Sequence, residues 1–181
     1  PKAETAFARQ AALYDTTIGW RFINPVMKAM YGVDAMPETA ENVAKDYQIE
    51  RQAQDEMALR SQLKAVAAQR AGWLAQEIVP VDVPQKKGVS LTVDQDEHPR
   101  ETSLEKLASL KGVVTPDGTV TAGNASGVND GACALLIASE KAMQEHNLKP
   151  RAKILGMATA GVPPRIMGIG PAPASKKVLA Q

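Results

Sequence analysis

The residues best suited to chemistry in this chain are its one cysteine and its two histidines. A cysteine thiolate is a nucleophile, and a nearby imidazole can serve as its base. Cys133, however, lies in the apolar run ACALLIAS, whose neighbours disfavour the charged thiolate. His98 and His146 stand in no recognisable spacing with it. The sequence therefore predicts that Cys133 is a buried packing residue, and it assigns no catalytic residue.

A second candidate is the acidic stretch DQDEH, residues 94–98. If it is read as a calcium loop that begins at Asp94, Glu105 takes the twelfth position. Pro99 then stands where the sharp turn needs glycine, and His98 takes a ligand position. A solvated acidic end of a hairpin is the better interpretation, and we expect no metal.

The third candidate is the glycine-rich stretch GTVTAGNASGVNDGA, residues 118–132. It is either an irregular turn or a loop that exposes its backbone amides to a ligand. Small residues let an extended ligand approach the main chain, and free N–H groups suit acyl or phosphate oxygens. The residues favour a ligand-binding loop, between the strand candidate TVTA and VNDGA, a segment with helical potential.

The secondary-structure elements that would carry these residues fall into two sections of the chain, a section of helices and a hairpin and then an α/β section. A mixed, alanine-rich start is followed by a helix from Pro37 or Glu38 to Tyr47 and a longer helix over about 50–70 that ends at Gly72. The stripe that we expect to pack on the longer helix is Ala53, Met57, Leu63 and Ala67.

Strand patterns replace helical ones after the longer helix. EIVPVDVP and GVSLTV alternate like the strands of a hairpin, with its turn at 85–88. Thr102 and Glu105 form a capping pattern ahead of a short helix. ACALLIAS and KILGMATAG are predicted as strands buried on both faces, and helices are predicted from Ser139 and within PASKKVLAQ. The predicted secondary structure therefore changes near residue 116, from a section of helices and a hairpin to an α/β section.

Bulk properties exclude several classes of protein. The formal net charge of the 181 residues is +1, which gives no overall attraction to nucleic acid or to an acidic membrane. One cysteine cannot form an internal disulfide. No apolar run reaches the roughly 18 residues of a membrane span. We expect a cytoplasmic protein, and the first residue, Pro1, suggests a processed or excised piece.

Several motifs together resemble the middle of a thiolase. They are GTVTAGNASGVNDGA, ACALLIASEKAMQ, GVPPRIMGIGPAPA, MPETAENVAKDY, RQAQDEMALRSQLKA, EIVPV and DEHPRETSLEKLASLK. They follow one another in the family's order over nearly the whole chain. Within the family, YDTTIGWRFINPVMKAMYGVDAMPETAEN is most similar to thiolases that act on 3-oxoadipyl-CoA in aromatic-compound breakdown.

The resemblance implies an α/β fold in which a loop domain of helices and a hairpin precedes part of a layered α/β/α core. On that map, residues 1–118 form the loop domain and residues 119–149 end the N-terminal half. Residues 150–181 begin the C-terminal half, which is truncated. The family's homodimers or homotetramers are expected here too.

The resemblance also implies an activity. A thiolase cysteine attacks a 3-oxoacyl-CoA, acetyl-CoA leaves, and CoA then takes the acyl group. The family's cysteine, histidine and second cysteine motifs match nothing in this chain, so we expect the chain alone to be inactive. CoA is a co-substrate, and no cofactor is expected. The alternative is a noncatalytic CoA- or acyl-binding module derived from a thiolase.

Several residues of this chain match positions that bind the substrate in the family. Ser126 and Gly127 match the loop that contacts pantetheine, and Ala122 lies beside them. Arg100 matches an arginine at the nucleotide end of CoA, where a guanidinium suits phosphate. Met36 matches a methionine that lines the acyl-thioester pocket. Ala35, which stands where biosynthetic members carry histidine, favours a degradative role.

Overall fold

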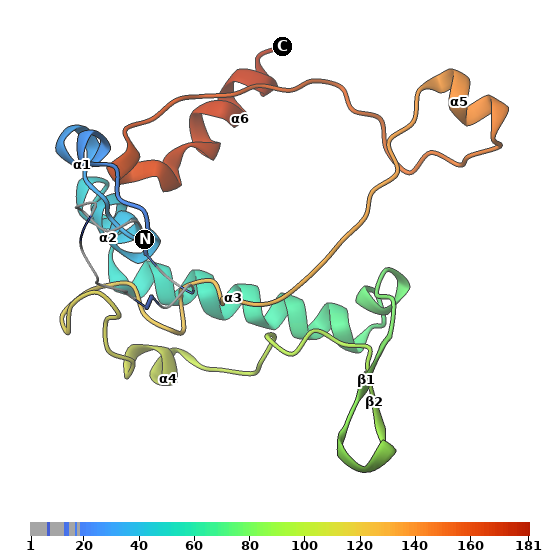
Figure 1. The fold of residues 1–181 in the computed structure, drawn as a ribbon, viewed down its shortest axis with the longest axis horizontal. Coiled ribbons are helices and arrows are strands. Elements are labelled where there is room, and N and C mark those ends of the chain that lie inside the picture. The colour runs from blue at the N-terminus through green and yellow to red at the C-terminus, as the bar shows by residue number, and fades with distance from the viewer. Residues whose placement is uncertain (1–6, 8–12, 15–16, 18) are drawn as a thin grey trace. The chain divides into compact units, whose positions relative to one another are not determined.

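The computed structural model describes residues 7, 13, 14, 17 and 19–181 (Figure 1). The chain divides into two units by its internal contacts. One unit is Asp34–Gly127, and the other combines Pro1–Val33 with Val128–Gln181. Most of the alanine-rich start lies outside the described residues. No described helix is both long and apolar enough to cross a membrane.

Helix α1 (Pro25–Tyr31) was not predicted, although its start signal is in the sequence. The Asn24 side chain accepts hydrogen bonds from the amides of Val26 and Met27, and Pro25 needs no partner for its nitrogen. Helix α2 (Met36–Asp46) confirms the prediction of a helix that begins near Pro37.

Helix α3 (Arg51–Arg70) confirms the longer helix, and Gly72 follows its end with a φ of 74°. The predicted packing stripe is wrong, because Met57 and Leu63 are 65% and 55% exposed, and Ala53 and Ala67 are exposed too. The face that packs carries Asp55, which is 3% exposed. That face meets loops through polar side chains, so apolar periodicity could not reveal it.

The predicted hairpin is confirmed. Strands β1 (Val81–Pro84) and β2 (Ser90–Val93) pair antiparallel around the short turn η2 (Lys86–Gly88), and η1 (Leu74–Gln76) precedes them.

Helix α4 (Leu104–Ala108) follows the hairpin, and its cap is Ser103 rather than the expected Thr102. The Ser103 hydroxyl accepts from the Lys106 amide at 3.3 Å. A hydrogen bond from Ser103, together with the backbone amide of Glu105, lowers the pKa of the Glu105 carboxyl.

In the other unit, α5 (Glu140–Glu145) is capped by Ser139 as predicted, and η3 (Pro164–Ile169) leads into α6 (Pro171–Leu179). The two buried strands expected over 132–139 and 153–161 are not formed. Both segments run as extended coil (Figure 1), and Leu135 and Leu155 are 88% and 89% exposed. Among the described residues, no strand pairs with either segment, and a buried strand needs such a partner. Residues 128–132 form no helix either.

The buried residues that the structure describes all lie in the unit Asp34–Gly127, on α2, α3, α4 and the glycine-rich segment. The buried apolar residues of the described chain are Ala44, Leu107 and Val120. The buried polar ones are Thr39, Asp55 and Thr121. The core of the described residues is therefore built from polar as well as apolar side chains.

Candidate functional site

The glycine-rich segment closes into a turn around Thr121, which is fully buried. The Thr121 amide donates to Asn124 Oδ1 at 2.7 Å, and its carbonyl accepts from the Ala125 amide at 3.0 Å. The Thr121 hydroxyl accepts from the Gly123 amide at 3.2 Å. A side chain that closes its own turn in this way fixes the local backbone. The predicted strand at TVTA is reduced to a single bridge between Gly112 and Thr121.

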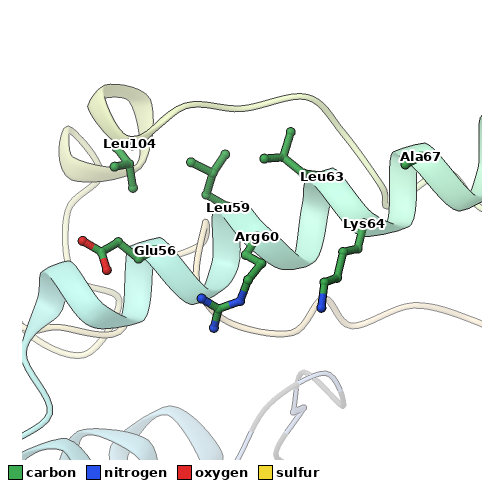
Figure 2. A pocket seen from close by; sticks show the side chains of 7 residues that line it. All are labelled: Glu56, Leu59, Arg60, Leu63, Lys64, Ala67 and Leu104. Atoms are coloured by element: carbon green, nitrogen blue, oxygen red, sulfur yellow. The ribbon is translucent and has the colours of Figure 1, made fainter.

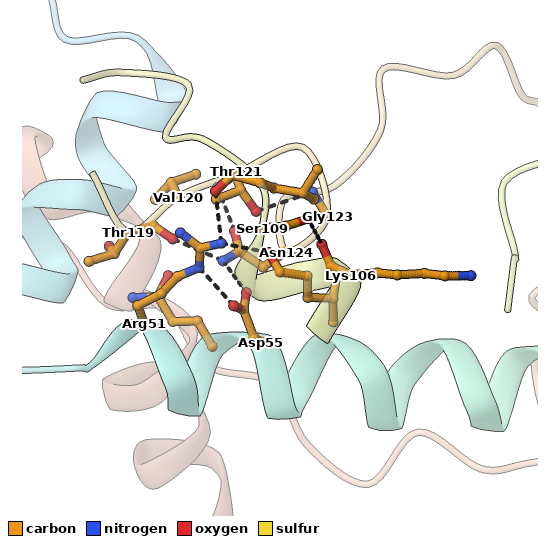
Figure 3. Close-up of polar contacts among 12 residues, drawn as sticks. Arg51, Asp55, Lys106, Ser109, Thr119, Val120, Thr121, Gly123 and Asn124 are labelled. Carbon is orange, nitrogen blue, oxygen red and sulfur yellow. Dashed lines mark hydrogen bonds and ion pairs between the residues drawn. The ribbon is translucent and has the colours of Figure 1, made fainter. Parts of the chain in front are cut away.

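Helix α3 holds this turn from below (Figure 3). Asp55 Oδ1 accepts from Asn124 Nδ2 at 3.0 Å, and Asp55 Oδ2 pairs with Arg51 Nε at 2.8 Å. Arg51 also donates to the carbonyls of Leu107 and Leu110, at 2.6 and 3.0 Å. One buried carboxylate thus joins the turn to α3 and, through Arg51, to the end of α4.

Helix α2 holds the start of the same turn. Glu41 Oε1 accepts from the Val120 amide at 2.7 Å, and Glu41 Oε2 accepts from the Thr119 hydroxyl at 2.9 Å. Hydrogen bonds to a carboxylate are stronger than neutral ones. We call Glu41, Arg51, Asp55 and Asn124 the polar clamp, since together they fix residues 119–124.

Two glycines of the motif lie close against side chains of the same unit, where a larger residue would collide. A Cβ on Gly123 would lie 2.6 Å from methyl carbons of both Leu107 and Leu110. A Cβ on Gly118 would lie 2.6 Å from Glu41 Oε1. Sequence reasoning missed the clamp, because its hydrogen bonds join residues that lie up to 79 positions apart in the chain. Its only sequence signal was the Asn124 side chain within a turn.

The predicted binding residues are all accessible. Ala122, Ser126 and Gly127 are exposed around the clamped turn. Met36, at the start of α2, is 71% exposed. Arg100 is exposed, and its backbone amide donates to Gln62 Oε1 of α3 at 2.9 Å. Within the described chain, no hydrogen bond or ion pair joins Arg100 or Met36 to the turn.

The other chemical candidates are dispersed. Cys133 is exposed, which corrects the expected burial, because its segment has no covering partner among the described residues. Residues 94–97 are exposed, as a solvated acidic stretch requires. In the part of the chain that the structure describes, no group of three His, Cys, Asp or Glu side chains could hold a metal.

A shallow groove of about 340 Å³ lies between α3 and α4 (Figure 2). Its lining residues are Glu56, Leu59, Arg60, Leu63, Lys64, Ala67 and Leu104. None of the predicted binding residues lines it.

Comparison with known proteins gives three kinds of match. Residues 3–141 match the family model described as the thiolase N-terminal domain. The chain is 63% identical over 178 residues to a beta-ketoadipyl-CoA thiolase of Pseudomonas putida, covering 98% of this chain and 44% of the relative. It is 58% identical to a 3-oxoadipyl-CoA/3-oxo-5,6-dehydrosuberyl-CoA thiolase of Escherichia coli, covering 98% and 45%.

Solved structures match as well. The acetyl-CoA acetyltransferase of Bacillus anthracis has a TM-score of 0.78 at 45% identity, over 86% of this chain and 40% of that one. Human mitochondrial 3-ketoacyl-CoA thiolase has a TM-score of 0.74 at 49% identity, over 80% and 37%. The chain therefore spans less than half the length of these relatives.

Proposed function

The chain belongs to the thiolase family and has a thiolase-like α/β fold, and we propose that it is the central segment of a degradative thiolase. The proposed reaction cleaves 3-oxoadipyl-CoA with CoA to give acetyl-CoA and a shortened acyl-CoA. The observation that carries the proposal is the 58–63% identity, over 98% of this chain, to thiolases named for that substrate.

The proposed chemistry has two steps. A cysteine thiolate attacks the 3-keto carbon, the bond between C2 and C3 breaks, and C2 takes a proton as acetyl-CoA leaves. The CoA thiolate then attacks the acyl-enzyme and releases the cysteine. We place the reacting cysteines and histidine outside these 181 residues, since Cys133, His98 and His146 match none of the family's motifs.

In this proposal the chain supplies binding groups. Ser126, Gly127 and Ala122 contact the pantetheine arm, Arg100 contacts the nucleotide end, and Met36 lines the acyl pocket. All five residues are accessible to a ligand, and the polar clamp, which fixes the backbone just before Ser126, supports the role of the turn. Residues 1–118 would form the loop domain, 119–149 the end of the N-terminal half and 150–181 the start of the C-terminal half.

The exposed apolar segments fit the same proposal. Leu135, Leu136 and Ile137 are 77–88% exposed, more than an unpaired segment of a stable protein tolerates. We propose that residues 132–139 and 153–161 become inner strands when they pair with further chain of a protein as long as the relatives.

The test is a thiolysis assay on the full-length protein, which follows the loss of the 3-keto thioester absorbance with 3-oxoadipyl-CoA or acetoacetyl-CoA. We expect CoA-dependent loss of both, with the higher kcat/KM for 3-oxoadipyl-CoA. A mixture without CoA is the control. If CoA binds but neither substrate is cleaved, the chain belongs to a noncatalytic CoA-binding module, and the proposal is wrong.

A further inference from the structure

Helix α3 carries three polar side chains at intervals of seven residues, and each is hydrogen-bonded to a different point of a distant loop. Asp55 accepts from Asn124 at 3.0 Å, and Gln62 accepts from the Arg100 amide at 2.9 Å. Gln69 donates to the Asp96 carbonyl at 3.1 Å. Seven residues are almost two helical turns, so the three side chains share one face at steps of roughly 10 Å.

Two of these contacts lead to residues that the proposed function places at opposite ends of CoA. Through Asn124, Asp55 fixes the turn that precedes Ser126, which the proposed function places beside the pantetheine arm. Gln62 fixes the backbone of Arg100, at the nucleotide end. Gln69 holds the same segment four residues before Arg100.

We infer that Asp55 and Gln62 are positioning residues that set the spacing between the pantetheine loop and Arg100 along one rigid helix. This inference rests on the proposed function. The physical reason is preorganisation: ordering a loop or a long side chain during binding costs affinity, and a loop that is already fixed avoids that cost. Gln62 is well suited to the role, because its carbonyl satisfies the amide of the very residue whose guanidinium must reach the ligand.

Loss of each contact should affect binding of CoA and of its fragment 4′-phosphopantetheine differently. Loss of the Gln62 contact should weaken binding of CoA but leave 4′-phosphopantetheine, which lacks the nucleotide, unaffected. Loss of the Asn124 contact with Asp55 should weaken binding of both. A merely structural role for Gln62 would affect the two ligands alike.

The experiment is calorimetric titration of the full-length protein with each ligand. We expect Gln62→Ala to raise the Kd for CoA about fivefold and to leave the Kd for 4′-phosphopantetheine within about twofold. Gln62→Glu keeps an acceptor for the Arg100 amide and should restore CoA binding. Gln52→Ala is the matched control, because Gln52 lies on the same helix, is exposed, and bonds only to Glu56 in the described chain.

A double-mutant cycle tests whether Gln62 acts through Arg100. If it does, Gln62→Ala should add little to the effect of Arg100→Ala on CoA binding. Additive effects would overturn the inference, as would equal weakening of both ligands by Gln62→Ala. If Asn124→Ala does not fold, the results for the Gln62 variants alone test the inference. If the variants change ligand binding as expected but the wild-type protein shows no thiolysis, the inference stands and the proposed function is wrong. If the wild-type protein binds no CoA, both are wrong.

Discussion

Among the residues of the polar clamp, Glu41 should give the clearest change in local stability when it is replaced. In Glu41→Ala, the buried Val120 amide loses its acceptor, which costs about 1–3 kcal/mol. The Thr119 hydroxyl loses a charge-assisted bond as well, so we expect a total of about 2–4 kcal/mol. Glu41→Gln can still accept from Val120 and donate to the Thr119 oxygen, so its cost should stay below about 1 kcal/mol.

The assay is amide hydrogen exchange in the full-length protein, read on the peptide that covers residues 119–125. Exchange there reports the free energy of local opening. A loss of 2 kcal/mol corresponds to roughly 30-fold faster exchange in Glu41→Ala, and less than about tenfold faster exchange is expected in Glu41→Gln. Glu56→Ala, an exposed change on α3, should have no effect. Unchanged exchange in Glu41→Ala would show that α2 does not hold the turn.

Four further outcomes are expected. Gly112→Ala should destabilise the protein in thermal unfolding by about 1–3 kcal/mol, since its Cβ would collide with the Thr115 carbonyl oxygen, and an unchanged melting temperature would contradict this close approach. Arg100→Ala should raise the KM for CoA about fivefold with little effect on kcat, because the contact serves ground and transition states alike, and an unchanged KM would contradict its role. The pKa of Glu105 is lowered from 4.5, so its contribution to stability is present above pH 4.5 and is lost as pH falls through the folded pKa. Glu105→Gln should flatten that loss in melting curves recorded below pH 4.5, and identical curves would contradict the hydrogen bond between Ser103 and Glu105. Cys133 should resist alkylation in the native full-length protein and react in urea, whereas fast native labelling would refute the proposed burial of residues 132–139.

Local signals predicted the elements that local interactions stabilise. The hairpin, the cap at Ser139 and the ends of α2 and α3 follow from turn residues, hydroxyl caps and the position of Gly72. The cap of α4 was misplaced by one residue, because Thr102 and Ser103 are both good caps and only the backbone geometry chooses between them.

Elements that depend on distant partners could not be predicted in the same way. The packed face of α3 is polar, and it is satisfied by Asn124 and by the Arg100 backbone, 69 and 38 residues away. Apolar periodicity therefore pointed to the wrong stripe. The strand pattern of 132–139 reflects a preference for burial, but a strand forms only where another backbone pairs with it. The accessible residues Ser126 and Arg100 came from family motifs, since exposure alone marks no site.

A crystal structure of the full-length protein with CoA is the most direct test of the central claim, that the clamped turn and Arg100 bind the two ends of CoA. We predict that the pantetheine arm lies against Ser126 and Gly127, and that the Arg100 guanidinium lies at the nucleotide end. We also predict that the contacts of Asn124 with Asp55 and of Gln62 with Arg100 remain intact in the complex. CoA bound elsewhere, with residues 122–127 and Arg100 free of it, would contradict the account.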